Sequence, residues 1–241
     1  MTSRLIALTF DANDPLALAY YWAGVLGREM AEDPEDGFAL LPNEGDTEFR
    51  LRFVQTSAQK SGPNQMHFDL TSTSLEHQRA TVARVLALGG RHLDIGQGAD
   101  AEHVVLADPD GNEFCVIEPD NDFLAGCGFI GALASDGSQA VGCFWSSALS
   151  WPLVWDQDEE TAIQSPRGGT KITWAGPPIE PKRGKERLHF DIAPPVDGDR
   201  DAEVERLLSL GATRVDIGQG DVSWVVMADP DGHEFCVLTP R

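Results

Sequence analysis

Two histidine–glutamate pairs carry the chemistry that this 241-residue chain could perform. His67 precedes Glu113 by 46 residues, and His189 precedes Glu234 by 45 residues. Histidine changes charge near neutral pH, and both side chains bind divalent metals, so each pair is suited to acid–base catalysis or to metal binding. Because the same pair occurs twice at nearly the same spacing, the chain contains two equivalent units.

The repetition extends well beyond these four residues. Residues 91–119 return at 213–240 with one deletion, and 18 of 28 aligned positions are identical. This repeat predicts two domains of about 120 residues, 1–120 and 123–241, with a boundary in the polar segment 119–122. A weaker internal repeat divides the first domain into modules 1–58 and 65–119, and the second into modules 123–180 and 187–241.

Each module shows the pattern of one strand, one helix and three further strands. In module 65–119, MHFDL alternates like a strand, and a helical pattern follows with capping-box spacing at Thr73 and Glu76 and a glycine stop at Gly89. The last two strand-like runs are joined by Asp-Pro-Asp-Gly at 108–111, which suits a type I turn. Module 1–58 has the same order, with a helix opened by Pro15 and ending near Gly27. The predicted fold is therefore α+β, built from four β-α-β-β-β modules.

The phrases that carry this pattern resemble a known superfamily. AYYWAGVLG, MHFDL, LHFDI, LADPDGNEFCV and MADPDGHEFCV are similar to segments of the vicinal oxygen chelate superfamily, which includes glyoxalase I, bleomycin-resistance proteins and extradiol dioxygenases. The resemblance is strongest to the uncharacterised glyoxalase-like branch and covers nearly the whole chain. It implies tandem pairs of modules that form open curled sheets around a cavity in each domain.

The resemblance also implies a divalent metal, such as Zn²⁺, Ni²⁺, Mn²⁺ or Fe²⁺, in members that are metal-dependent. The positions of a histidine and a glutamate ligand match four residues of this chain: His67, Glu113, His189 and Glu234. The position of the first ligand falls near Leu5 and near Gly128, neither of which coordinates a metal through its side chain. A fourth ligand has only Glu48 and Gln55 as candidates, both in the first unit. The resemblance therefore implies an incomplete metal site in each unit, and no cofactor is fixed by the sequence.

Polar residues beside the histidines indicate an alternative without metal. Asp69 and Asp191 each follow a histidine by two residues, so they lie on the same strand face. A histidine, an aspartate and a glutamate in one pocket could perform acid–base chemistry, and Arg52 could bind an anionic group of a substrate. The structural alternative is a satisfied polar cluster in which each histidine bonds its glutamate and an aspartate pairs with an arginine such as Arg52.

Tryptophans are concentrated in the second unit, which contains five of the six in the chain. Of these, Trp155, Trp174 and Trp224 fall on predicted strands and are candidates for a pocket that stacks on a planar ligand. Trp224 stands where the first unit has His103, so the two pockets should differ. The alternative is that these side chains belong to the hydrophobic core.

The overall composition excludes several functions. The net charge of −21 disfavours nucleic acid and anionic membranes, which are bound through clustered lysine and arginine. The apolar runs are shorter than the roughly 20 residues that span a bilayer, and the N-terminus resembles a first strand more than a signal peptide. The four cysteines show no C-x-x-C motif, which favours a reducing, cytoplasmic location.

These observations predict a glyoxalase-like or bleomycin-resistance-like protein that binds a small, aromatic or carbonyl-bearing molecule in a cavity. The alternative is a metal-dependent lyase, isomerase or dioxygenase. We expect no nucleic-acid or membrane partner, and a monomer or a homodimer.

Overall fold

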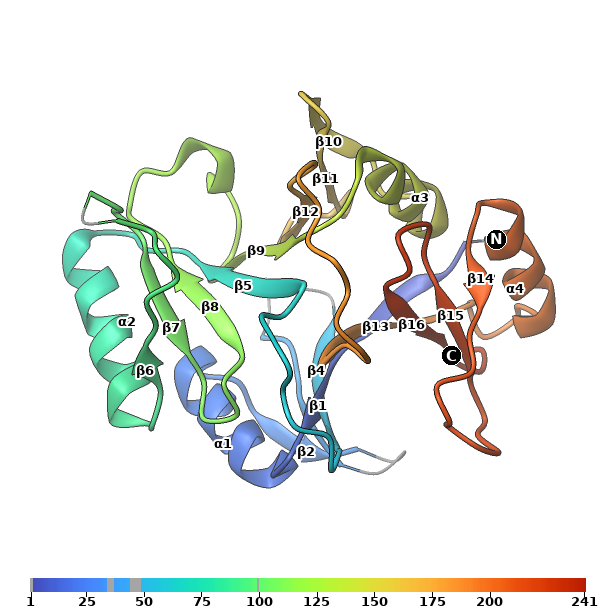
Figure 1. Ribbon diagram of the computed structural model, residues 1–241, viewed down its shortest axis with the longest axis horizontal. Helices are drawn as coiled ribbons and strands as arrows, with labels where there is room; N and C mark the ends of the chain where they lie inside the picture. The colour runs from blue at the N-terminus through green and yellow to red at the C-terminus, as the bar shows by residue number, and fades with distance from the viewer. Residues whose placement is uncertain (1, 34–36, 44–48, 99) are drawn as a thin grey trace.

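A computed structural model describes residues 2–33, 37–43, 49–98 and 100–241, and it contains the β-α-β-β-β order in all four modules (Figure 1). The first module consists of β1 (Arg4–Ala12), α1 (Pro15–Leu26), β2 (Met30–Glu32), β3 (Phe38–Leu40) and β4 (Arg50–Gln55). The second consists of β5 (Met66–Leu70), α2 (Leu75–Ala87), β6 (Arg91–His92), β7 (Val104–Ala107) and β8 (Glu113–Val116).

The second half of the chain repeats these elements after a short 3₁₀ helix, η1 (Asp122–Leu124). The third module has β9 (Ile130–Ser135), α3 (Gln139–Leu149), β10 (Leu153–Gln157), β11 (Glu160–Gln164) and β12 (Lys171–Trp174). The fourth has β13 (Leu188–Ala193), α4 (Arg200–Ser209), β14 (Thr213–Arg214), β15 (Val225–Ala228) and β16 (Glu234–Val237). The α+β class and the modular architecture are confirmed.

The strands form two mixed sheets of eight, and each sheet joins modules from both sequence units. Sheet A has the order β14-β15-β16-β13-β1-β4-β3-β2, and sheet B has the order β10-β11-β12-β9-β5-β8-β7-β6. The first module therefore pairs with the fourth, and the second with the third. This corrects the expectation that units 1–120 and 123–241 each enclose a cavity of their own. The physical reason is that β1 pairs antiparallel with β13 and β5 with β9, so the central seam of each sheet crosses the units.

The helix boundaries follow from local capping. Asp14 accepts a hydrogen bond from the backbone N–H of Ala17, Pro15 occupies the first turn of α1, and Gly27 ends the helix in the left-handed conformation. The N-cap of α2 is Ser74, which accepts from the N–H of His77, so the predicted capping box at Thr73 is displaced by one residue.

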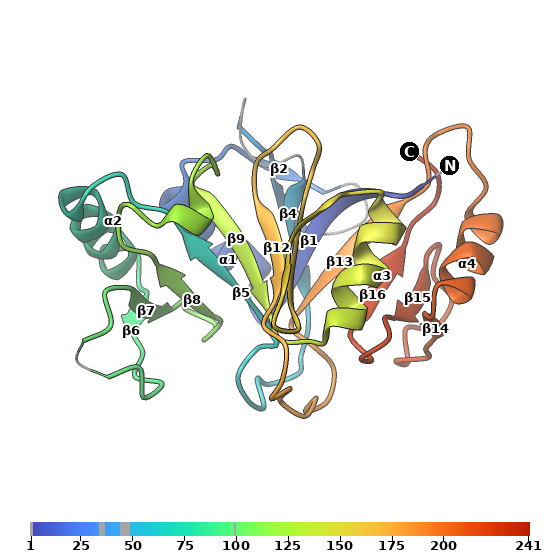
Figure 2. The same cartoon turned by 90° about the horizontal axis from the view of Figure 1, so that it is seen from above.

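One tryptophan in each of α1 and α3 ties the two sheets into a single core. Trp22 packs edge-on against Phe68 and Phe114 of sheet B, although α1 belongs to a module of sheet A. Trp145 makes the equivalent contacts with Phe190 and Phe235 of sheet A. Figure 2 shows the result, with α1 and α3 near the middle and α2 and α4 at opposite ends.

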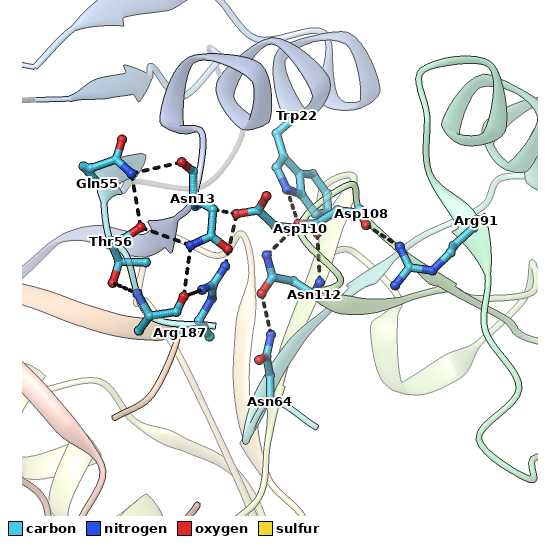
Figure 3. Close-up of polar contacts among 11 residues, drawn as sticks. Asn13, Trp22, Gln55, Thr56, Asn64, Arg91, Asp108, Asp110, Asn112 and Arg187 are labelled. Carbon is cyan, nitrogen blue, oxygen red and sulfur yellow. Dashed lines mark hydrogen bonds and ion pairs between the residues drawn. The ribbon is translucent and has the colours of Figure 1, made fainter. Parts of the chain in front are cut away.

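The two copies of the Asp-Pro-Asp-Gly hairpin make the same contact with a helix tryptophan, which accounts for the repetition of the motif. The Trp22 indole N–H donates to Asp108 Oδ2 at 3.1 Å, and the Trp145 indole donates to Asp229 Oδ2 at 3.2 Å. The main-chain and side-chain N–H groups of Asn112 also donate to Asp108 (Figure 3). The motif therefore fixes the helix of one sheet to a hairpin of the other.

The second aspartate of the hairpin extends this network to the loops that join the modules. Asp110 accepts from the backbone N–H of Asn13 at 2.8 Å and from the Arg187 guanidinium at 3.1 Å (Figure 3). Arg187 also donates to the carbonyl of Ala58. Segments near residues 13, 58, 110 and 187 are thus held together at one point.

Over the described residues, no helix is long and apolar enough to cross a membrane.

Candidate functional site

A cavity of about 370 Å³ lies against sheet A. One side is polar, with His189 and Asp191 from β13, Arg52 from β4 and Thr9 from β1. A group of apolar side chains that pack together also lines it, including Val226 and Trp224 at the start of the β15 hairpin. Further lining residues come from the joining loop, the β14–β15 loop and β16, and include Lys185, Glu186, Ile217, Gln219, Glu234 and Cys236. Because β1 and β4 come from the first unit and β13 and β16 from the second, neither unit could form this cavity alone.

Arg52 is the centre of a buried ion-pair network in this wall. Its Nη1 donates to Asp191 Oδ2 at 2.7 Å, and its Nε donates to Asp33 Oδ2 at 2.9 Å. Thr9 Oγ1 donates to the same Asp191 oxygen at 2.7 Å. Burial alone would lower the pKa of Arg52, but the two carboxylates outweigh it and raise that pKa above its ordinary value. Arg52 is therefore neutralised by the protein's own acids, which weakens the prediction that it binds a substrate anion.

His189 lies beside the free oxygen of Asp191. Its Nε2 is 3.6 Å from Asp191 Oδ1, and Cys236 completes a cluster whose candidate ligand atoms all lie within 4.8 Å of one another. Burial and the neighbouring Asp191 charge raise the pKa of the Cys236 thiol well above its ordinary value. Cys236 is therefore a neutral thiol here and a poor nucleophile.

The two predicted glutamates bind lysines of the loops that join the modules. Glu234 Oε1 lies 2.6 Å from Lys182, and Glu113 Oε1 lies 2.6 Å from Lys60. Glu113 also accepts from the backbone N–H of Asn64, at 3.1 Å. Neither glutamate belongs to the His/Asp/Cys cluster of its sheet. The structure thus brings each predicted histidine together with an aspartate and a cysteine rather than with its glutamate.

One difference between the repeats adds an ionisable residue, Glu186, to the lining of the sheet A cavity. Where the second module has Asn64 bonded to Asn112, the fourth has Glu186 facing His233, with 3.9 Å between Glu186 Oε1 and His233 Nε2. Burial, together with the nearby Glu234 and Asp229 charges, raises the pKa of Glu186 to about 7. Burial alone would lower the pKa of His233, but the hydrogen bond and charge of Asp229, together with the charges of Glu186 and Asp231, raise it to about 9.

Sheet B holds the equivalent cluster of His67, Asp69 and Cys115, again with ligand atoms within 4.8 Å of one another. The neighbouring residues differ. Ala134 pairs with His67 where Thr9 pairs with His189, and Thr173 pairs with Ala134 where Arg52 pairs with Thr9. Thr173 therefore occupies in sheet B the position that Arg52 holds beside Asp191 in sheet A.

The linker between the units packs onto the face of sheet B that carries Cys115. Leu124 of η1 is buried and packs in one apolar cluster with Cys115, Ala132, Val105 and Ile117. The equivalent cluster of sheet A consists of Ala193, Val226, Cys236 and Leu238, with Ile6, Ile217 and Trp224 packed against it.

The predicted tryptophan pocket is not assembled. Trp224 lines the cavity, whereas Trp174 is almost fully buried in the main core and Trp155 is exposed on the edge strand β10, against Phe123. Strand alternation alone could not distinguish these three environments, since each tryptophan occupies a regular strand position or a strand start.

The predicted first-ligand positions also lie away from the clusters. A register shift between Leu5 and Ala7 in β1 turns Leu5 into the main core and Ile6 toward the apolar wall with Trp224. Gly128 precedes β9, and pairing makes Ile130 the counterpart of Leu5. Gln55 donates to backbone carbonyls of Asn13 and Thr56, and Glu48 lies outside the described residues.

Sequence reasoning missed the joining loop 182–187 and the β14–β15 loop as parts of the site. Lys185 pairs with Asp11, and both line the cavity. Gly218 and Gln219 of the repeated Gly-Gln-Gly segment line it as well. The shared spacing of Lys60 and Lys182, each the same distance before its histidine, was the available signal for the loop.

The comparison with family profiles decides the relationship. A profile described as glyoxalase-like domain matches residues 7–117 and 132–238. The chain belongs to this glyoxalase-like domain family. The recognition from sequence of the vicinal oxygen chelate superfamily is thereby confirmed. No curated protein matches the chain.

Solved structures similar to this glyoxalase-like chain confirm the fold. Glyoxalase I from Zea mays superposes with a TM-score of 0.63 at 13% identity, over 99% of this chain and 92% of the other. A putative dioxygenase from Bacillus subtilis superposes with a TM-score of 0.61 at 15% identity, over 99% of this chain and 85% of the other. At such identities the likeness concerns the fold and leaves the chemistry to the residues of the site.

Proposed function

We propose that the protein binds one small organic molecule, with a planar aromatic or carbonyl-bearing part, in the sheet A cavity. The observation that carries this proposal is the contrast between a polar wall and an apolar wall in the same cavity. His189 lies on its polar wall, while Trp224, Ile217 and Val226 form an apolar wall. A cavity of this volume that places polar groups beside apolar side chains is typical of small-molecule sites.

The two walls have separate tasks in this proposal. The Trp224 ring provides a face for stacking, which is worth about 0.5–1.5 kcal/mol beyond the area it buries. His189 is held by Asp191, whose other oxygen is fixed by Arg52 and Thr9. A histidine oriented in this way can donate a hydrogen bond to a ligand carbonyl and can exchange a proton with it.

The test is a binding screen of small aromatic aldehydes, ketones and acids by thermal shift, followed by calorimetry on the hits. A ligand of this cavity should lose at least tenfold in affinity in Trp224→Ala and in His189→Gln. Trp155→Ala is the matched control, because Trp155 is exposed on a different sheet, and its affinity should not change. A hit that binds to both cavity variants with the affinity of the wild type would refute the assignment.

A second candidate function is metal-dependent lyase, isomerase or dioxygenase chemistry, favoured by the two His/Asp/Cys clusters. The sheet A residues do not suit the metal that the family implies. Glu234 is paired with Lys182, Asp191 with Arg52, and Leu5 faces the core. The sheet B cluster does provide three suitable ligand types. Turnover that requires Mn²⁺, Ni²⁺, Zn²⁺ or Fe²⁺ and is abolished by His67→Ala, but not by His189→Ala, would favour this candidate over the first.

Location and assembly belong to the same proposal. The free cysteines support a reducing compartment such as the cytoplasm. Both sheets form within one chain, so the paired modules need no second copy, which supports a monomer. Size-exclusion chromatography with light scattering tests the latter directly, and a dimer of about twice 26.1 kDa would contradict it.

A further inference from the structure

The two His/Asp/Cys clusters contain the same three residue types but differ in what holds the aspartate. In sheet A, Asp191 Oδ2 accepts from both Arg52 and Thr9. In sheet B, over the part of the chain that the structure describes, the only recorded polar partner of the Asp69 carboxylate is His67, with Nε2 3.5 Å from Oδ1. The Asp69 carboxylate, unlike that of Asp191, therefore keeps oxygen lone pairs available to bind a metal ion.

The geometry of the sheet B cluster suits a small divalent ion. Bond lengths of about 2.0–2.3 Å in a tetrahedral site place neighbouring ligand atoms about 3.3–3.8 Å apart. His67 and Asp69 already lie at such a separation, and Cys115 Sγ lies within 4.8 Å of both. Small side-chain rotations would complete a three-ligand site. A thiolate, an imidazole and a carboxylate together favour Zn²⁺ or Co²⁺ over Mg²⁺ or Ca²⁺.

His67, one of the three ligands, has access to solvent. His67 lines a hollow of about 270 Å³ together with Ala134 and Thr173. Its side chain is 35% exposed, whereas that of His189 is 11% exposed. A metal could enter from this side and keep a water molecule in the fourth position, as open zinc sites do.

The surroundings of the sheet A cluster oppose a metal. The positive charge of Arg52 lies against Asp191, and a divalent cation beside Asp191 would repel it. Asp191 would also have to give up hydrogen bonds with Arg52 and Thr9 to bind an ion with that oxygen. Thr173 stands in sheet B where Arg52 stands in sheet A, so one residue of the first module separates the two outcomes.

We propose that His67, Asp69 and Cys115 form a site for one Zn²⁺-type ion in sheet B, and that the equivalent His189, Asp191 and Cys236 do not bind metal. This ligand set differs from the histidine–glutamate pair expected from the sequence, because Glu113 is engaged by Lys60 and Asn64. The proposal concerns a different sheet from the proposed ligand cavity, so either can fail without the other.

Cobalt titration of the metal-free full-length protein tests the proposal. Co²⁺ should bind with one equivalent and give a thiolate-to-cobalt absorption band in the near ultraviolet. The band should disappear in Cys115→Ser and His67→Ala, and Zn²⁺ should displace it. Cys236→Ser and His189→Ala are the matched controls from the other sheet and should keep the full band. No band, two equivalents, or loss of the band in Cys236→Ser would overturn the proposal.

A second test introduces an arginine into sheet B at the position equivalent to Arg52. Thr173→Arg places a guanidinium in sheet B at the position that Arg52 holds in sheet A, and Co²⁺ affinity should fall at least tenfold. Circular dichroism and the unfolding midpoint establish that each variant is folded before titration. If folded Thr173→Arg and folded Cys115→Ser both bind Co²⁺ like the wild type, the cluster is not the metal site.

Discussion

Arg52 Nη1 and Asp191 Oδ2 lie 2.7 Å apart, although 139 residues separate them in the chain. The first is on β4 of the first module, and the second is on β13 of the fourth. Their contact records the pairing of these modules in sheet A, and it lies in the wall of the cavity. Formation of the candidate site is therefore coupled to the docking of the two sequence units.

Removal of the arginine charge should be costly. Arg52→Met keeps much of the side-chain volume but leaves Asp191 and Asp33 buried without their cation. Both carboxylates are almost fully buried, and breaking such a pair typically costs about 3–5 kcal/mol. Urea unfolding should show this loss, and Asp191→Asn in the same chain should recover part of it. Thr173→Val at the equivalent position should change stability by about 0.5 kcal/mol or less. A loss below about 1 kcal/mol for Arg52→Met would mean that the pair is not needed to stabilise the acids.

The indole hydrogen bonds should make similar contributions in the two halves. Trp22→Phe removes a donor to the buried Asp108, and Trp145→Phe removes one from Asp229. Hydrogen bonds to charged groups contribute about 1.5–3 kcal/mol, so each variant should lose roughly that amount in the free energy of unfolding. Trp155→Phe on the exposed edge strand is the control and should stay within about 0.5 kcal/mol. Unequal losses from the first two would show that the hairpins are not equivalent.

Local patterns predicted the modules well because each element is determined by nearby residues. Alternation in MHFDL, Pro15 at the start of α1 and Gly27 at its end act within a few positions of one another. The pairing of modules is different. The seam strands β5 and β13 have nearly the same sequence, so the alternation is satisfied by either partner. The choice depends on contacts between distant residues, such as Trp22 with Phe114.

The candidate site was predicted in composition more than in geometry. His67, His189 and their aspartates lie on the expected strand faces, and the cysteines join them. The glutamates are expected beside the histidines because their positions match a ligand of the superfamily, but Lys60 and Lys182 from the loops engage them. The register shift that turns Leu5 into the core has no signature in strand alternation.

Glu186 should give the protein a measurable pH dependence of stability. Burial raises its pKa from 4.5 to about 7 in the folded state, so the folded protein binds more protons than the unfolded chain between these values. Stability from this group therefore falls as pH rises from about 4.5 to 7. Glu186→Gln should remove this slope and stabilise the protein at pH 8, by at most about 3 kcal/mol.

Two observations keep this prediction specific. His233 gives a slope of the same sign at higher pH: its pKa is raised to about 9, so its stabilising contribution is complete below about 6.5 and is lost as pH rises through 9. The comparison is therefore made as a difference between wild type and variant across pH 4.5–8. Glu205→Gln, at an exposed residue, should leave the wild-type slope unchanged. An identical slope in Glu186→Gln would contradict the assignment.

Leu124 should shield Cys115, on the face of sheet B, from reagents in solvent. Its side chain packs against Cys115 and Ala132, so Leu124→Ala removes apolar contacts and leaves a cavity. The expected loss is about 2–5 kcal/mol in the free energy of unfolding. Because the cavity opens next to Cys115, alkylation of this cysteine, followed by mass spectrometry, should become faster, whereas Cys236 in the other sheet should react at the wild-type rate. Phe123→Ala is the neighbouring control, since Phe123 is exposed and lies outside this cluster. If Leu124→Ala leaves both stability and Cys115 alkylation unchanged, the linker does not shield Cys115 from solvent.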